Sequence, residues 1–154
     1  HLSGDLVRHP DILQTLAREL DGVSKATNAA PPLVLTLNER QISAETEQVA
    51  RALAPLLDLG CRIAVSDYGG DTSSFRFLIH LPVSFIQLDT NLVRLTSESA
   101  RARSILATIQ HTAQDLGITT IAKQIEDEAT LQRLIDVGVD WGSGYLFGRP
   151  SEPG

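Results

Sequence analysis

The sequence is poor in the features that mark membrane proteins, disulfide-stabilised secreted proteins and nucleic-acid-binding proteins. Its 154 residues contain one cysteine, Cys61, so no disulfide can form within the chain. No apolar run approaches the roughly 20 residues that a membrane-spanning helix needs, and no signal-peptide pattern opens the chain. The net charge of -6 argues against a nucleic-acid partner, because a nucleic-acid backbone favours a basic surface. We therefore expect no membrane insertion in this segment, no nucleic acid, and a reducing cytoplasm as the compartment.

Histidine and cysteine are too few and too scattered to suggest a metal centre. The four histidines stand at positions 1, 9, 80 and 111, without the short spacings of metal ligands. Cys61 directly precedes an apolar strand, so we interpret it as a small buried side chain rather than a reactive thiol. What is present is an ordinary globular composition, 42% hydrophobic and 21% charged, long enough for one domain with its own core.

Apolar residues recur at helical spacing in several segments. The predicted helices comprise residues 10–21, 43–60, 73–81, 97–116 and 128–137, and residues 22–32 are predicted to form a loop. Ser43 and Asp127 are placed to cap the second and the last of these helices, and Pro55 is expected to kink or restart the second. The buried stripe of the longest helix is expected to comprise Ala102, Ile105, Ile109, Ala113 and Leu116.

Short apolar runs between these helices are typical of strands. They comprise residues 33–37, 62–65, 85–88 and 118–122, with further extended segments at 139–141 and 144–147. The runs are continuously apolar rather than alternating, which favours strands covered on both faces. Strands alternating with helices predict an α/β fold with a parallel sheet. A complete barrel of this kind takes about 250 residues, so this chain is too short to close one by itself.

Residues 62–75, RIAVSDYGGDTSSF, are the most informative segment. An apolar strand leads into Ser66 and Asp67, then into a Gly-Gly turn and a Ser-Ser pair. The segment resembles the signature "DDFGTGYSSL" of bacterial EAL domains, the cyclic di-GMP phosphodiesterase family. The first acid of that signature holds catalytic metal in the family, and here its position is Ser66.

Five further segments resemble the same family in the same order. Residues 1–13, HLSGDLVRHPDIL, resemble "NLSARQLRDPDFL", and residues 33–40, LVLTLNER, resemble "LILEITES". Residues 81–93, LPVSFIQLDTNLV, resemble "LPVDYLKIDRSFV", and residues 116–127, LGITTIAKQIED, resemble "LGLKVVAEGVET". Residues 138–150, GVDWGSGYLFGRP, resemble "GCDYGQGYLFSRP". The resemblance implies that residues 1–154 form the C-terminal two-thirds of a degenerate EAL-like domain. It implies an incomplete TIM-like (β/α) barrel of the EAL type, with mainly parallel strands and outer helices.

The resemblance also implies which positions have changed. The family hydrolyses a phosphodiester with two Mg²⁺ or Mn²⁺ ions, which need several oxygen ligands, mostly carboxylates. Its metal-binding or catalytic residues correspond here to His1, Thr36, Ser66, Gln87, Lys123 and Ser143. At positions 36, 66 and 123 the family carries about three negative charges, whereas Lys123 gives this chain one positive charge. We therefore expect no metal, no other cofactor and no catalytic residue.

Three charged residues remain as candidates for ligand binding, namely Asp67, Lys123 and Glu126. Asp67 either caps a loop or contacts a ligand, and Lys123 is either solvated or pairs with Asp67. Asp89 is expected to accept backbone N–H groups. Trp141 and Tyr145 either fill the end of the barrel or stack on a base.

The resemblance and the lost carboxylates together favour a catalytically inactive EAL-like domain of the bacterial cytoplasm. It would act in cyclic di-GMP signalling as a regulatory module, through a protein partner or through self-association. A first alternative is a receptor that binds cyclic di-GMP without hydrolysing it, and the isolated chain would then bind weakly. An active phosphodiesterase is the second and least favoured alternative.

Overall fold

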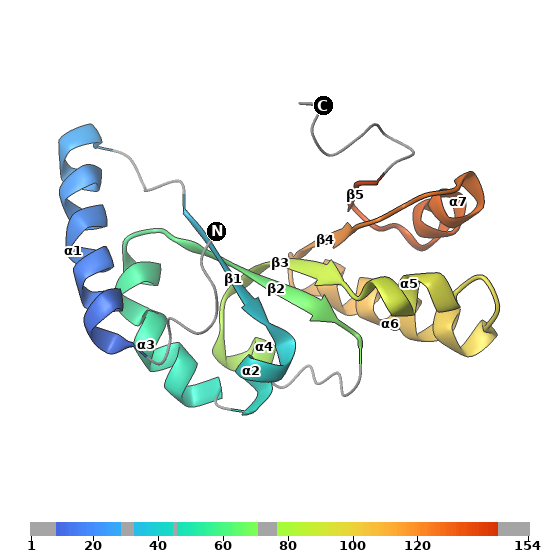
Figure 1. Ribbon diagram of the computed structural model, residues 1–154, viewed down its shortest axis with the longest axis horizontal. Helices are drawn as coiled ribbons and strands as arrows, with labels where there is room; N and C mark the ends of the chain where they lie inside the picture. The colour runs from blue at the N-terminus through green and yellow to red at the C-terminus, as the bar shows by residue number, and fades with distance from the viewer. Residues whose placement is uncertain (1–8, 29–32, 45, 71–76, 145–154) are drawn as a thin grey trace. The chain divides into compact units, whose positions relative to one another are not determined.

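The computed structural model describes residues 9–28, 33–44, 46–70 and 77–144, and the fold is reported for these residues (Figure 1). One sheet has the order β1 (Val34–Asn38), β2 (Arg62–Tyr68), β3 (Val83–Leu88), β4 (Thr119–Ala122) and β5 (Trp141–Gly142). The pairs β3–β4 and β4–β5 are parallel, with Phe85 opposite Thr119 and Ile121 opposite Trp141. Each strand pairs with its predecessor in the chain, as in the wall of a TIM-like barrel. The predicted α/β class and the incomplete barrel are confirmed.

Helices separate the strands. They are α1 (Pro10–Thr27), α2 (Glu39–Ala44), α3 (Thr46–Asp58), α4 (Phe77–His80), α5 (Thr90–Leu95), α6 (Ala100–Asp115) and α7 (Glu128–Val137). Within the described segments, no helix is both long enough and apolar enough to cross a membrane.

The described residues form two compact units. The first runs as far as Ala64 and also contains the segment from α4 to Val83, and the second contains Val65–Gly70 and the residues from Ser84 onward. In the first unit, α1 packs against α3. The contact buries Leu13 of α1, while α3 buries Val49, Leu53 and Leu56. Pro55 lies inside α3 without ending it.

A buried polar network holds β4 in the second unit. Thr120 is fully buried, and its hydroxyl donates to Oε1 of Gln110 at 2.6 Å. The same hydroxyl oxygen accepts the backbone N–H of Asp140 at 3.1 Å, and Oδ2 of Asp140 accepts the backbone N–H of Thr120 at 2.9 Å. Nε2 of Gln110 donates to the carbonyl oxygen of Gly138 at 2.8 Å. The network therefore connects β4 to α6 and to the turn that precedes β5.

Two boundary predictions were wrong, and the short helices α2 and α5 were missed. Helix α1 continues to Thr27 through the predicted loop, because its last turns need little burial and gain an ion pair between Lys25 and Asp21 at 2.8 Å. Ser43 lies inside α2 and α3 begins at Thr46, so the predicted start of this helix at Ser43 is wrong. Helices α2 and α5 were not predicted, because a six-residue helix carries too few apolar positions to show a period.

The buried face of α6 was predicted with the wrong phase. Ala102, Ile109 and Ala113 are buried as expected, but Ile105 and Leu116 are 50% and 54% exposed. Leu106 and Gln110 are buried in their place. A polar side chain on the inner face is tolerated because the amide of Gln110 is hydrogen-bonded on both sides, to Thr120 and to Gly138.

Candidate functional site

Most of the positions singled out from the sequence lie at or just beyond the carboxyl ends of strands. In the second unit these positions are Ser66 and Asp67 on β2, Gln87 on β3, Lys123 after β4 and Ser143 after β5. Thr36 lies on β1 in the first unit and is buried, with 8% of its surface exposed. His1 lies outside the described residues. Because the carboxyl ends of parallel strands meet at one edge of a sheet, the second unit presents these side chains along one edge.

The end of β2 lies beside the start of α5, although α4 and β3 separate them in the chain. Ser66 is half-buried, and Asp67 is exposed with a left-handed φ of 55°. An aspartate adopts this conformation more readily than most residues. The carbonyl oxygen of Tyr68 accepts the backbone N–H of Asp89 at 2.8 Å. This bond holds the end of β2 beside the first residue after β3.

Asp89 has a structural role that the sequence predicted. Its Oδ2 accepts the backbone N–H of Leu92 at 2.9 Å, which caps α5. Its Oδ1 lies against Gly70, where a Cβ atom would stand 3.4 Å from that oxygen. The expectation that Asp89 accepts a backbone N–H is confirmed.

A bulge in the main chain presents Lys123. The carbonyl oxygen of Ala122 accepts the N–H of Ser143 at 2.9 Å, and the carbonyl oxygen of Ser143 accepts the N–H of Ile125 at 2.9 Å. A regular parallel ladder would place one residue between Ala122 and the next donor, whereas here Lys123 and Gln124 both lie between them. Both side chains are exposed as a result.

Two residues at this bulge have a positive φ, which few side chains tolerate. Gln124 has a φ of 56°, and it occupies the place of the glycine in the family segment "AEGVE". Gly144 has a φ of 155°, and a Cβ atom on it would lie 2.3 Å from the backbone nitrogen and oxygen of Ile125. A side chain at Gly144 would therefore push the chain away from the bulge. The predicted site position Ser143 contributes its backbone groups here, while its side chain is exposed.

Lys123 and Glu126 line the same groove. Its volume is about 340 Å³, and α5 contributes Thr90, Asn91, Val93 and Arg94 while the other wall contains Lys123, Gln124, Glu126, Asp127 and Thr130. Two of the three predicted ligand-binding residues are thus brought together, and Asp67 does not line this groove. Lys123 makes no ion pair within the described part of the chain, so the ion pair with Asp67 is not formed.

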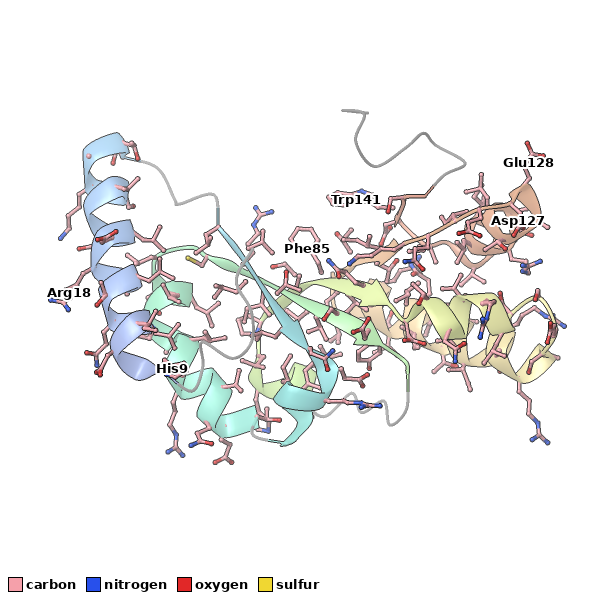
Figure 2. The ribbon with its side chains drawn as sticks, viewed as in Figure 1. His9, Arg18, Phe85, Asp127, Glu128 and Trp141 are labelled. Atoms are coloured by element: carbon pink, nitrogen blue, oxygen red, sulfur yellow. The ribbon has the colours of Figure 1, made fainter. Side chains whose placement is uncertain are left out.

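Asp127 precedes α7 as its N-cap residue (Figure 2). It is also one of the residues that line this groove. Its Oδ1 accepts the backbone N–H of Thr130 at 2.7 Å, and its Oδ2 accepts the hydroxyl of Thr130 at 3.0 Å. The backbone hydrogen bond from Thr130 is the main reason why the pKa of Asp127 lies below its usual value. The predicted cap is confirmed, and both oxygens of this carboxylate are engaged.

Two aromatic residues of the sheet, Phe85 on β3 and Trp141 on β5, contact each other. The ring centroids of Phe85 and Trp141 are 5.7 Å apart with 36° between the planes (Figure 2). Trp141 is 58% exposed, so it contacts Phe85 at its side and remains accessible to solvent. Tyr145 lies outside the described residues. On the same face as Phe85, two residues further on, Oε1 of Gln87 is buried with no hydrogen-bond partner among the described residues.

The donor set of the second unit does not fit the two divalent ions that the resemblance implies. At the strand ends it offers the hydroxyls of Ser66 and Ser143, the amide of Gln87, the carboxylates of Asp67 and Asp89 and the ammonium group of Lys123, and the Asp89 carboxylate already caps α5. Hard dications need several oxygen ligands, and an ammonium group cannot donate a lone pair to them. Among the described residues, no three side chains of the His, Cys, Asp or Glu type gather as a metal site would require.

Comparison with known proteins agrees with the strand order and with the sequence segments. The EAL domain family matches residues 1–150. The chain is 28% identical over 145 residues to the cyclic di-GMP phosphodiesterase RocR of Pseudomonas aeruginosa, covering 92% of this chain and 37% of RocR.

Two solved structures have similar folds. BlrP1 of Klebsiella pneumoniae, in complex with calcium and cyclic di-GMP, has a TM-score of 0.82 and 27% identity over 97% of this chain and 37% of that chain. The FimX EAL domain of Pseudomonas aeruginosa, bound to cyclic di-GMP, has a TM-score of 0.78 and 25% identity over 94% of this chain and 58% of that chain. The chain thus spans less than two thirds of RocR and of each of these structures. Since the family match extends over nearly all of the chain, this protein belongs to the EAL domain family.

Proposed function

We propose that this EAL domain is catalytically inactive and acts as a regulatory, protein-interacting module in cyclic di-GMP signalling. The observation that carries the proposal is Lys123, an exposed ammonium group at the position of a family metal-binding glutamate. A positive charge at this place repels Mg²⁺ or Mn²⁺ and replaces a ligand that the ion needs. Two-metal hydrolysis depends on ions that clamp the attacking water and the phosphate, so the reaction loses its principal source of rate enhancement.

Thr36 and Gln87 are two further positions at which a charged residue of the family is replaced by an uncharged one. Thr36 replaces a second carboxylate on β1, and it is buried, so its surroundings suit an uncharged side chain. Gln87 replaces the lysine that stands near the attacking water in the family. Its amide can neither carry that charge nor serve as a proton donor of comparable strength.

An assay of product formation tests the proposal. Purified protein is incubated with cyclic di-GMP and an excess of Mg²⁺ or Mn²⁺, with RocR as the positive control for the same reagents. We expect no linear dinucleotide above the background of a protein-free reaction. Turnover at a rate near that of RocR would refute the proposed inactivity.

A protein partner or self-association is the proposed mode of action. It is supported by apolar side chains that the second unit leaves exposed, namely Ile105, Leu116, Ile135 and Trp141, each at least half exposed. Light scattering over a wide concentration range tests self-association, and a mass that stays at the monomer value throughout would leave only a different protein as partner. A cytoplasmic location and the absence of nucleic-acid binding remain predictions.

A non-hydrolysing cyclic di-GMP receptor is the second candidate. It is favoured by the groove that Lys123 and Glu126 share, and by the cyclic di-GMP bound to BlrP1 and to the FimX EAL domain. For the isolated chain we expect a dissociation constant above about 10 μM, equivalent to less than about 7 kcal/mol. Calorimetric titration with and without Mg²⁺ measures it. Sub-micromolar binding would place the receptor ahead of the protein-interaction module.

A further inference from the structure

Three arginines of the second unit, called the arginine cluster below, lie around the turn between α5 and α6. Thr96 in this turn is buried. Nη1 of Arg103, on α6, donates to the carbonyl oxygen of Thr96 at 2.8 Å, and Nε of Arg133, on α7, donates to its hydroxyl oxygen at 3.3 Å. The third, Arg94, belongs to the last turn of α5. Since α6 packs against both α5 and α7, arginines from three helices are brought to one place (Figure 1).

The described residues supply no carboxylate that forms an ion pair with the arginine cluster. Glu98 lies in the same turn, but it is exposed and makes no such pair there. The hydrogen bonds from Thr130 lower the pKa of Asp127 most, and the charge of Arg133 lowers it further. Both oxygens of Asp127 are nevertheless engaged by Thr130. The positive charges of the cluster are therefore left largely for a partner outside the chain.

Most of the N–H donors of the cluster are also left over. A guanidinium group has five N–H donors. Arg94 uses one of them on Oδ1 of Asn91, Arg103 uses one on Thr96, and Arg133 uses two, on Thr96 and Thr130. These bonds hold the side chains in place, so less conformational freedom is lost when an anion binds.

The surroundings of the cluster favour a protein segment over a nucleic acid. Leu95 directly follows Arg94 and is 42% exposed, and arginine beside an exposed apolar side chain is typical of protein interfaces. The net charge of -6 repels a long polyanion. Each guanidinium group matches one carboxylate in a bidentate pair, so three of them on three helices suit several carboxylates spaced along a chain.

We propose that the arginine cluster docks an acidic segment of a partner protein. Carboxylates of that segment pair with Arg94, Arg103 and Arg133, and one of its apolar side chains contacts Leu95. The proposal rests on the proposed protein-interacting function and adds to it the surface used and the chemistry of the partner. An isolated positive patch on an acidic domain also fixes the orientation in which such a partner binds.

Fluorescence anisotropy tests the proposal with a short labelled peptide of glutamate, leucine and serine. Its counterpart has glutamine in place of every glutamate. We expect the acidic peptide to bind, the counterpart not to bind, and the binding to weaken as salt is raised. Arg103→Gln and Arg133→Gln should each weaken binding by about three- to tenfold. Arg103→Lys should lie between wild type and Arg103→Gln, because it keeps the charge and loses the planar fork.

Two further variants separate docking from folding and from general charge effects. Arg94→Gln breaks one bond to the exposed Asn91, so it should weaken binding without unfolding the chain even if the other variants unfold. Arg101→Gln is the matched control and should bind like the wild type. Arg101 is an exposed arginine of the same helix as Arg103, two residues before it and so about 200° away around the helix.

Several outcomes would overturn the proposal. They are binding of the glutamine peptide as tight as that of the acidic one, equal weakening by Arg101→Gln and Arg94→Gln, and no binding of the acidic peptide to the wild type. Tighter binding of an oligonucleotide, or a dimer that is lost in the cluster variants, would assign the surface to nucleic acid or to a second copy instead. Product formation from cyclic di-GMP is measured separately, so the proposed inactivity can stand or fall without this surface.

Discussion

Replacing Thr120 by valine should destabilise the second unit, although the two side chains have the same shape. The substitution deletes the hydroxyl that donates to Oε1 of Gln110 at 2.6 Å and accepts the N–H of Asp140. Gln110 is 2% exposed, so water cannot readily replace the lost donor. Asp140 is exposed, and its N–H can turn to solvent. The expected cost is that of one buried acceptor left without a partner, about 1–3 kcal/mol.

Urea unfolding measures this cost. The single tryptophan, Trp141, directly follows Asp140 and reports on the same turn by its fluorescence. With a slope of about 1.5 kcal/mol per molar urea, a cost of about 2 kcal/mol lowers the midpoint by about 1.3 M. Thr119→Val is the matched control, because Thr119 is the half-buried neighbour on the same strand and makes no side-chain hydrogen bond among the described residues.

The control should change stability by less than about 0.5 kcal/mol. If Thr120→Val proves no more destabilising than Thr119→Val, then the network does not hold β4 in the way described. An unchanged slope in both variants is needed for this comparison, since a changed slope would indicate a different unfolding transition.

Further expectations follow from the strand ends. Gln124→Gly should be more stable than Gln124→Ala by about 0.5–1 kcal/mol in thermal unfolding, because glycine adopts a φ of 56° without steric cost; the opposite order would contradict the left-handed conformation. A double-mutant cycle of Lys123→Ala and Asp67→Ala should give a coupling below about 1 kcal/mol, since both side chains are exposed, and a larger coupling would indicate an ion pair. Folding lowers the pKa of Asp127, so its carboxylate adds to the free energy of unfolding above the pKa of the unfolded chain, and this contribution is lost as pH falls through the folded pKa. Asp127→Asn should remove this part of the pH dependence. Unfolding measured between pH 2 and pH 6, roughly the range of carboxylate titration, checks the expectation.

Local signals in the sequence predicted those elements whose ends are set by nearby residues. Helix α7 has the predicted bounds, because Asp127 bonds to Thr130 three residues away and Gly138 takes a φ of 98° at the other end. The EAL-type fold was predicted from short segments that occur in a fixed order. In these cases the interactions that determine the structure lie within a few residues or within one motif.

Longer-range contacts explain what the sequence did not predict. Gln110 can be buried in α6 because its amide is hydrogen-bonded to Thr120 and Gly138, which lie 10 and 28 residues further along the chain. The pattern of apolar residues within the helix does not predict these partners. The bulge at Lys123 and Gln124 depends on hydrogen bonds to Ser143. The groove needs α5, whose six residues show no helical period. The capping residue Asp89 was the one signal that could have located α5.

The strand order has a consequence for how the chain folds. Among the described strands, each one after β1 pairs with the strand made just before it, so during synthesis each of them meets an edge that already exists. The loops closed at each step are short compared with the whole chain, which favours rapid folding. Strand β4 is the exception, because Thr120 completes its hydrogen bonds only when Asp140 has been made 20 residues later. The segment that carries Lys123 should therefore be among the last to become protected from amide hydrogen exchange on the growing chain.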